Sequence, residues 1–131
     1  MPLPTGNADM LRASDKIITD YLAHLRRNDI AVQVKSKLIE SLSAGQPTQE
    51  SIATALNMST RNLQRRLHLE GTSFKMLLDE IRKDLSQQYI KNSNLSINEI
   101  TFMLGFSEPA NFTRAFKRWT GHSPSEYRLS H

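Results

Sequence analysis

One pattern of apolar and polar residues occurs twice in the sequence, and this internal repeat constrains the possible folds more than any other feature. The copies run over residues 51–71 and 99–121, about 48 to 50 residues apart, with one extra residue in the turn of the second copy. Each copy has a short apolar segment, a polar turn, and a second apolar segment closed by glycine. That layout is typical of a helix-turn-helix unit. We therefore predict two such units in one chain.

The second helix of each unit is expected to have one apolar face and one polar face. Positions i, i+3, i+4 and i+7 lie together on a helix of about 3.6 residues per turn. The residues expected to point inward are Leu63 and Leu67 in the first unit and Phe112, Ala115, Phe116 and Trp119 in the second. Those expected to point outward are Arg61, Gln64, Arg65 and His68 in the first unit and Ala110, Thr113, Arg114 and Lys117 in the second. Arginine and glutamine reach base edges in the major groove and lysine meets phosphate, so such a face suits DNA recognition.

A polar helix face also has a simpler explanation as solvated surface, and a single such face would favour that explanation. Two faces, each behind a polar turn and an apolar supporting helix, favour recognition instead. For Arg114 two interpretations stay open: contact with DNA, or an ion pair with Glu99 or Glu108. His68 is expected at the surface rather than at a metal, because the other histidines have no ligand spacing with it.

Capping residues and glycines divide the sequence into helices, and no segment alternates as a strand does. Helices are expected at about residues 15–27, 32–43, 48–56, 60–69, 74–91, 97–104, 109–120 and from 124 onward. Two capping boxes are recognisable, Ser96 with Glu99 and Ser123 with Glu126, and Ser107 is the expected cap of the helix that starts at 109. The predicted fold class is all-α.

Composition argues against several classes of function. The chain has no cysteine, which removes disulfide scaffolds, thiolate zinc sites and cysteine nucleophiles, including the alkyl transfer of Ada-type proteins. It has no Ser-His-Asp order, glycine-rich phosphate loop or His-Glu-x-x-His motif, so we expect no enzyme, no cofactor and no metal. Its apolar runs are too short to span a membrane, and the first residues lack the features of a signal peptide. We expect a cytoplasmic protein associated with the nucleoid.

Positive charge is concentrated in the part of the chain that carries the repeat. The net charge is +4 at pH 7, and the sequence pI is about 9.6. Residues 1–33 hold four basic and four acidic side chains, so the whole excess lies in residues 34–131. An anionic partner such as nucleic acid fits that distribution.

The residues of both units resemble those of a known family, the AraC/XylS regulators. The segments similar to that family's second motif are 96–109, 112–121 and 123–128, and those similar to its first motif are 58–67 and 70–74. The resemblance covers about residues 34–129 and is more specific in the second motif. It implies a seven-helix domain in which two helix-turn-helix units are joined by a long linker helix, residues 74–91, in a homeodomain-like, AraC-type arrangement.

The resemblance also implies that both recognition helices, residues 60–69 and 109–120, enter successive major-groove segments on one face of the duplex. The positions implied for base contact are Arg61, Gln64, Arg65, Ala110, Thr113 and Arg114. Ala110 cannot hydrogen-bond through its side chain, which leaves an apolar contact with a thymine methyl group. The candidates for phosphate contact are Arg66, His68, Lys117, Arg118 and Arg128. A linker of about 18 residues spans about 27 Å, close to the roughly 34 Å of one DNA turn.

Residues 1–33 lie outside the resemblance. Regulators of this family carry a sensing and dimerising domain before the DNA-binding one. We therefore expect residues 1–33 to be the tail of that domain or a linker from it, and residues 34–131 to be the DNA-binding domain. The implied partners are a double-stranded DNA operator, RNA polymerase contacted during activation, and a small-molecule inducer held by the sensing domain. A helical protein-interaction module stays open as an alternative, with the amphipathic helix expected over 15–27 as its docking surface.

Overall fold

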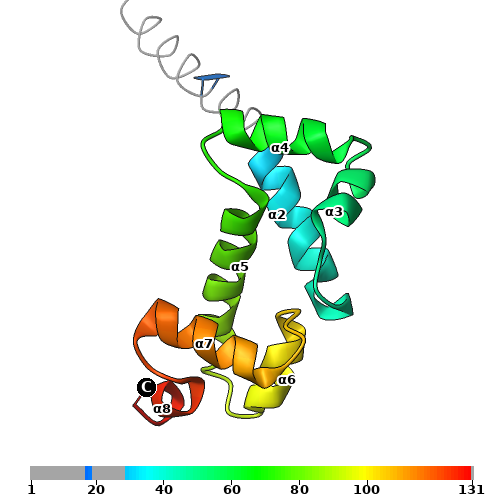
Figure 1. The fold of residues 1–131 in the computed structure, drawn as a ribbon. Coiled ribbons are helices and arrows are strands. Elements are labelled where there is room, and N and C mark those ends of the chain that lie inside the picture. The colour runs from blue at the N-terminus through cyan, green and yellow to red at the C-terminus, as the bar shows by residue number, and fades with distance from the viewer. Residues whose placement is uncertain (1–16, 19–28, 131) are drawn as a thin grey trace, which may run out of the picture.

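A computed structural model of the chain describes residues 17–18 and 29–130, and every regular element in that part is helical (Figure 1). The described elements are α2 (Ile30–Ser41), the 3-10 turn η1 (Leu42–Ala44), α3 (Gln49–Ala55), α4 (Thr60–Leu69), α5 (Phe74–Tyr89), α6 (Ile97–Met103), α7 (Pro109–Thr120) and α8 (Pro124–Ser130). The all-α prediction is confirmed. None of these helices has the length and apolar character that a membrane crossing requires.

The N-terminal helix expected over 15–27 lies outside the described residues except for Ile17 and Ile18, which are helical and exposed. The next helix begins at Ile30, two residues before the expected start. Its first amides are capped by a residue far along the chain: the Glu70 carboxylate accepts from the backbone N–H of Ile30 and of Ala31, both at 3.0 Å. A carboxylate at a helix N-terminus satisfies unpaired donors and the helix dipole. Ile30 is fully buried, so the packed unit extends to this residue.

The turn of each helix-turn-helix unit passes through a left-handed backbone conformation at the same place. Asn57 follows α3 with φ of 58°, and Gly105 follows α6 with φ of 79°. Asparagine tolerates this conformation better than most residues that carry a Cβ. At Gly105 a Cβ would also lie 2.9 Å from the Leu42 carbonyl oxygen and 3.0 Å from that of Gly45. The second turn therefore requires glycine for close packing as well as for its dihedral angle.

Serine caps begin most of the helices at the predicted positions. Side-chain oxygens of Ser59, Ser73 and Ser96 accept from the amides three residues later, at 3.0 to 3.2 Å. The expectation that Ser107 caps α7 is wrong. The N-cap position is Glu108, without a side-chain cap, and Ser107 Oγ instead accepts from Asn111 Nδ2 at 3.2 Å. The extra residue in this turn moves the helix start to Pro109, whose missing N–H needs no cap.

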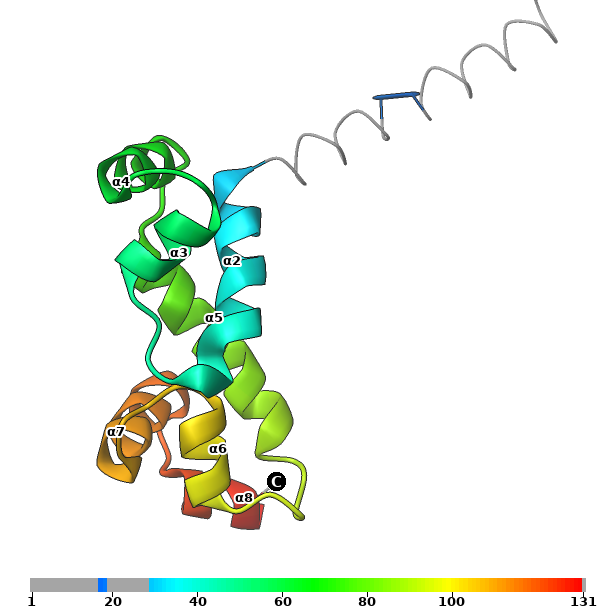
Figure 2. The same ribbon diagram turned by 90° about the vertical axis from the view of Figure 1, so that its right-hand side faces the viewer.

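Two hydrophobic cores lie at the two ends of α5, one in each unit (Figures 1 and 2). The first core is built by α2, α3, α4 and the N-terminal half of α5, where Leu77 and Ile81 are buried. The second is built from α6, α7 and the C-terminal end of α5, with Ile90 among its buried residues. Leu85 packs against both cores. The linker helix, which ends at Tyr89 rather than at 91, is therefore part of each unit and not a spacer between them.

The apolar face predicted for α7 is the centre of the second core. Phe112 and Phe116 are completely buried, Ala115 is 5% exposed, and Trp119 is half-buried. The Phe116 ring meets the Tyr127 ring edge-on, with the centroids 5.2 Å apart, which brings α8 into the same core.

We expect Phe116→Ala to lower the free energy of unfolding by about 3 to 5 kcal/mol, because the substitution removes buried surface and leaves a cavity. A domain of this size has only about 5 to 15 kcal/mol of stability. Urea unfolding followed by circular dichroism measures the loss. Arg114→Ala, at an exposed position of the same helix, is the control and should change stability by about 0.5 kcal/mol or less. Equal losses in the two variants would contradict the assignment of the two faces.

Candidate nucleic-acid interface

The second helices of the two units, α4 and α7, lie on the same side of the molecule. Figure 2 shows them at one edge, at opposite ends of α5, with α2 on the other side of the linker helix. The 16 residues of α5 span about 24 Å at about 1.5 Å per residue. That length is of the order of one DNA turn, about 34 Å. One rigid chain therefore presents two helices as a dimer of single units would.

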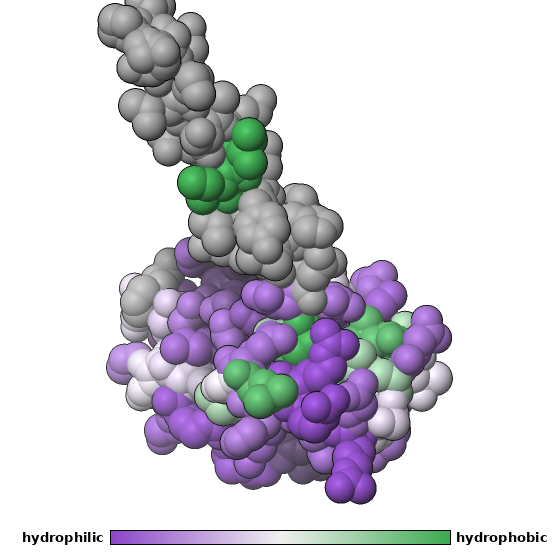
Figure 3. Space-filling view, turned by 90° about the horizontal axis from the view of Figure 1, so that it is seen from above, coloured by the Kyte–Doolittle hydropathy of each residue, from purple (hydrophilic) through white to green (hydrophobic). Residues whose placement is uncertain are grey.

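The outward face of α4 carries the residues that the sequence placed there. Arg61, Gln64, Arg65 and His68 are exposed, and together with Ser59 and Asn62 they line one shallow depression. Arg66 is half-buried at the side of this face. The surface at this end of the molecule is mostly hydrophilic, with scattered hydrophobic side chains (Figure 3). Leu69, the last residue of α4, is exposed.

The corresponding face of α7 is less polar, because Ala110 takes the place of an arginine. Ala110, Arg114 and Lys117 are exposed, and Thr113 is half-exposed. Among the described residues Arg114 forms no ion pair with Glu99 or Glu108. Its guanidinium instead donates to the side-chain oxygen of Asn111.

An asparagine orients the central arginine in both units. Arg65 donates to Asn62 Oδ1 at 2.8 Å, and Arg114 donates to Asn111 in the same i, i−3 relation. The two pairs are separated by 49 residues, the period of the repeat at this point. Sequence reasoning missed both asparagines, although their shared place in the repeat was a usable signal. An oriented guanidinium loses less freedom when it binds a planar acceptor pair such as the guanine edge.

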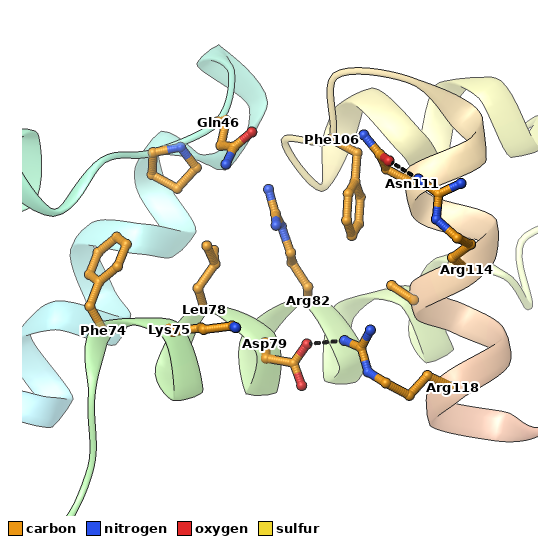
Figure 4. Close-up of a pocket in the computed structure, with 12 residues that line it drawn as sticks. Gln46, Phe74, Lys75, Leu78, Asp79, Arg82, Phe106, Asn111, Arg114 and Arg118 are labelled. Carbon is orange, nitrogen blue, oxygen red and sulfur yellow. Dashed lines mark hydrogen bonds and ion pairs between the residues drawn. The ribbon is translucent and has the colours of Figure 1, made fainter.

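Two of the residues predicted to contact phosphate are engaged within the protein. Arg118 pairs with Asp79 of α5 at 2.7 Å (Figure 4). Trp119 Nε1 donates to both oxygens of the same carboxylate at 3.2 Å. Arg128 donates to the backbone carbonyls of Ile90 and Asn92 at 3.1 and 3.2 Å, beyond the end of α5. Both arginines therefore hold helices together, and a phosphate role for them stays a prediction.

A cleft of about 460 Å³ separates the two units, and Arg82 of α5 lines it (Figure 4). The Arg82 guanidinium donates to the carbonyl oxygens of Leu104 at 2.7 Å and Gly105 at 2.8 Å, and it lies 4.1 Å from the centre of the Phe106 ring. Burial lowers the pKa of Arg82, and the nearby Asp79 carboxylate opposes that shift. Sequence reasoning assigned no role to Arg82. Its spacing of four residues from Leu78 and seven from Tyr89 is compatible with the apolar stripe, but an exposed arginine at the edge of that stripe would have the same spacing.

Within residues 29–130 the carboxyl groups with shifted pKa values are those of Glu99 and Glu126, and the capping boxes account for both. The Ser96 amide and hydroxyl hydrogen-bond to Glu99 and hold the pKa of its carboxyl below the usual 4.5. Ser123 lowers the pKa of Glu126 in the same way. No group of three or more His, Asp or Glu side chains in the described part of the chain is placed to hold a metal ion. Glu99 is therefore a helix cap in this structure.

These features define a helix-turn-helix DNA-binding domain with two recognition helices. A family model described as a helix-turn-helix domain matches residues 52–130. The chain belongs to the AraC-type family of transcription regulators and carries its DNA-binding domain. This family is not a class of enzymes, and a separate helical protein-interaction module is not favoured.

Named relatives and a solved structure agree with this assignment. The ornithine utilization regulator of Pseudomonas aeruginosa is 44% identical over 82 residues, which are 63% of this chain and 24% of the relative. The urease operon transcriptional activator of Escherichia coli is 33% identical over 72% of this chain and 33% of its own length. The DNA-binding domain of AdpA, solved in complex with a target DNA, is similar with a TM-score of 0.65 and 29% identity over 78% of this chain and 92% of that domain. The chain thus spans a quarter to a third of the length of these two regulators.

The capping boxes make part of the stability depend on pH. Because the folded-state pKa values of Glu99 and Glu126 are lowered, their contribution is complete above the unfolded-state pKa of about 4.5 and is lost as pH falls through the lower folded-state values. Carboxyl carbon shifts followed by NMR should titrate below 4.5 for both residues. Ser96→Ala should return the pKa of Glu99 toward 4.5 and leave that of Glu126 unchanged. A Glu99 titration indifferent to Ser96 would contradict the capping geometry.

Proposed function

We propose that this chain binds a specific double-stranded DNA operator through α4 and α7 together and that it regulates transcription, as an activator. The observation that carries the proposal is the placement of both recognition helices on one side of a single rigid linker, each with an arginine oriented by an asparagine. The likeness to a domain solved on its target DNA supports the same mode of binding.

Base contacts in this proposal come mainly from α4. Arginine pairs with the O6 and N7 of guanine and glutamine with adenine, so Arg61, Gln64 and Arg65 supply three readers of the major groove. In α7 the corresponding positions are Ala110, Thr113 and Arg114. Ala110 offers a methyl contact to thymine, and only the other two can donate hydrogen bonds through their side chains. The second unit therefore reads less sequence than the first.

Phosphate contacts surround these readers. Arg66, His68 and Lys117 flank the two outward faces without an ion pair in the described structure. The Arg118 side chain is 63% exposed and has further N–H groups for a phosphate while one remains on Asp79. Arg128 donates to two carbonyls and contributes through its remaining N–H groups. These contacts set affinity and register and carry no sequence information.

The longer regulator around this domain belongs to the proposal as well. The residues before Ile30 link the domain to a sensing domain that binds a small-molecule inducer, and the bound regulator contacts RNA polymerase. It acts in the cytoplasm on the nucleoid and has no catalytic activity. The matched part is only a quarter to a third of the two regulators, and this partial coverage supports the existence of a further domain. Mass spectrometry of the protein made by its native host tests it, and a native product of 131 residues would contradict it.

Arg65→Ala should weaken binding to a duplex selected from a random library by about 1 to 3 kcal/mol and relax the preference at one base pair. Its circular dichroism should be unchanged, because the side chain is exposed. Asn62→Ala keeps Arg65 but removes its partner at 2.8 Å, and should cause a smaller loss of the same kind. Fluorescence anisotropy on the selected duplex and on random DNA measures both. Equal losses on the two duplexes would show that Arg65 meets phosphate only.

Binding should weaken steeply with salt, because phosphate contacts release counterions. With roughly 5 to 8 contacts, log K should fall against log salt with a slope of about −5 to −7. Lys117→Ala should reduce the slope by about one. Lys37→Ala is the matched control, because Lys37 lies on α2, away from the side that α4 and α7 share. A flat salt dependence, or equal effects of the two substitutions, would contradict the proposed interface.

A further inference from the structure

The two helix-turn-helix units meet at a small junction around Arg82 rather than through a common core. Each unit has its own hydrophobic cluster, and Leu85 packs against both. Outside α5, α6 and its following turn lie against η1 of the first unit. Because Leu85 is the residue that the two described clusters share, we infer that hydrophobic packing alone does not determine how the units are oriented. The polar contacts at the junction therefore determine the orientation of one unit relative to the other.

Arg82 holds the end of α6 through several contacts at once. Its guanidinium donates to the carbonyl of Leu104, the C-cap residue of α6, and to that of Gly105 in the turn that follows. The positive charge also meets the negative end of the α6 dipole and the face of Phe106. The residue is only 8% exposed, so these contacts are shielded from water. A lysine cannot reproduce them, because only the planar fork of arginine meets two acceptors while it stacks on a ring.

The turn whose carbonyls accept from Arg82 also packs closely against the first unit. A Cβ at Gly105 would approach the Leu42 and Gly45 carbonyls to 2.9 and 3.0 Å and the Arg82 guanidinium to 3.3 Å. The backbone of Gly105 is thus enclosed between α5 on one side and the end of η1 on the other. Neither the turn nor Arg82 can shift without disturbing the other.

A second contact on α5 acts on the recognition helix itself. Asp79, one turn before Arg82, pairs with Arg118 and accepts from Trp119 near the end of α7. The linker helix therefore holds the second unit at two points, the end of α6 and the end of α7 (Figure 4). The N-terminal half of the same rigid helix packs in the core that supports α4.

We propose that Arg82 is a positioning residue that locks α7 at one distance and angle from α4, and so sets the base-pair spacing that the two recognition helices accept together. The part that concerns spacing rests on the proposed DNA binding, whereas the part that concerns helix geometry does not. One base pair changes the separation by about 3.4 Å and the direction by about 34 to 36 degrees. A junction that moves by this much reads two spacings instead of one.

The geometry is tested in the full chain without DNA. The sequence contains no cysteine, so Gln64→Cys on α4 and Lys117→Cys on α7 provide two unique sites for nitroxide labels. Double electron–electron resonance should give one narrow distance distribution. Adding Arg82→Met should broaden or shift it by about 3.4 Å or more, the rise of one base pair. Lys83→Met, at the exposed neighbouring position of α5, is the matched control and should leave it narrow.

A broad distribution in the labelled chain without further substitution overturns the proposal, and so does a folded Arg82→Met protein with an unchanged distribution. If Arg82→Met does not fold, Arg82→Lys decides the matter, because it keeps the charge and the aliphatic stem. The lysine variant should broaden the distribution while circular dichroism stays helical. A narrow distribution in Arg82→Lys would show that the hydrogen bonds from Arg82 to the two carbonyls do not hold α7 in place, and it would overturn the proposal.

The spacing is tested by selecting duplexes from a random library with the unsubstituted chain and with Arg82→Lys. The unsubstituted chain should enrich two short elements at one spacing and lose about tenfold in affinity, about 1.4 kcal/mol, when one base pair is inserted between them. Arg82→Lys should enrich the same elements at several spacings and lose about threefold or less on insertion. The same single spacing in both proteins overturns the proposal. If the unsubstituted chain enriches no sequence at all, the proposed function is wrong. The distance measurement without DNA still tests whether Arg82 fixes the position of α7 relative to α4.

Discussion

The guanidinium of Arg82 lies between two hydrophobic cores and donates to two carbonyls just after α6, and the arrangement of the molecule depends on this contact. A buried charge is costly unless its hydrogen bonds are satisfied. Here two carbonyls, an aromatic face and the Asp79 charge meet that need. Gly105 makes the contact possible, because a Cβ there would clash with the Leu42 carbonyl of the first unit and crowd the guanidinium. The relation between the two units thus depends on a few polar groups.

Each helix-turn-helix pair is completed by a third helix from outside the repeat. In the first unit α2 supplies Ile30, Val34 and Leu38 to the core, and Glu70 caps its start. In the second unit α8 brings Tyr127 against Phe116, and Arg128 of α8 donates to carbonyls at and beyond the end of α5. Two short helices bury too little surface to be stable alone, so these additions allow each unit to present its recognition helix on a firm base.

The two units have the same arrangement of helices but present different side chains on their recognition helices. The α4 face offers arginine, glutamine and histidine, while the α7 face offers alanine, threonine and arginine. The common element is the asparagine that orients the central arginine. An AraC-type domain of this form can combine a recognition helix that contacts many bases with one that contacts few. When α4 is bound, the fixed distance between the helices raises the effective concentration of α7 at its own site, which strengthens the weaker contact.

The repeat, the helical class, the inward faces of α4 and α7 and most of the caps were predictable from the sequence, because each depends on neighbours within one or two turns. Phe112 and Phe116 are buried as their spacing predicted, and Ser96 with Glu99 forms the expected capping box. The tertiary structure alone decided that Arg82 lies inside, that Glu70 starts α2, and that Arg118 and Arg128 bond to α5 and the residues just after it. The partners of these side chains are 22 to 40 residues away. No local pattern tells an arginine that meets solvent from one that meets a distant carbonyl, because both are compatible with the same helix.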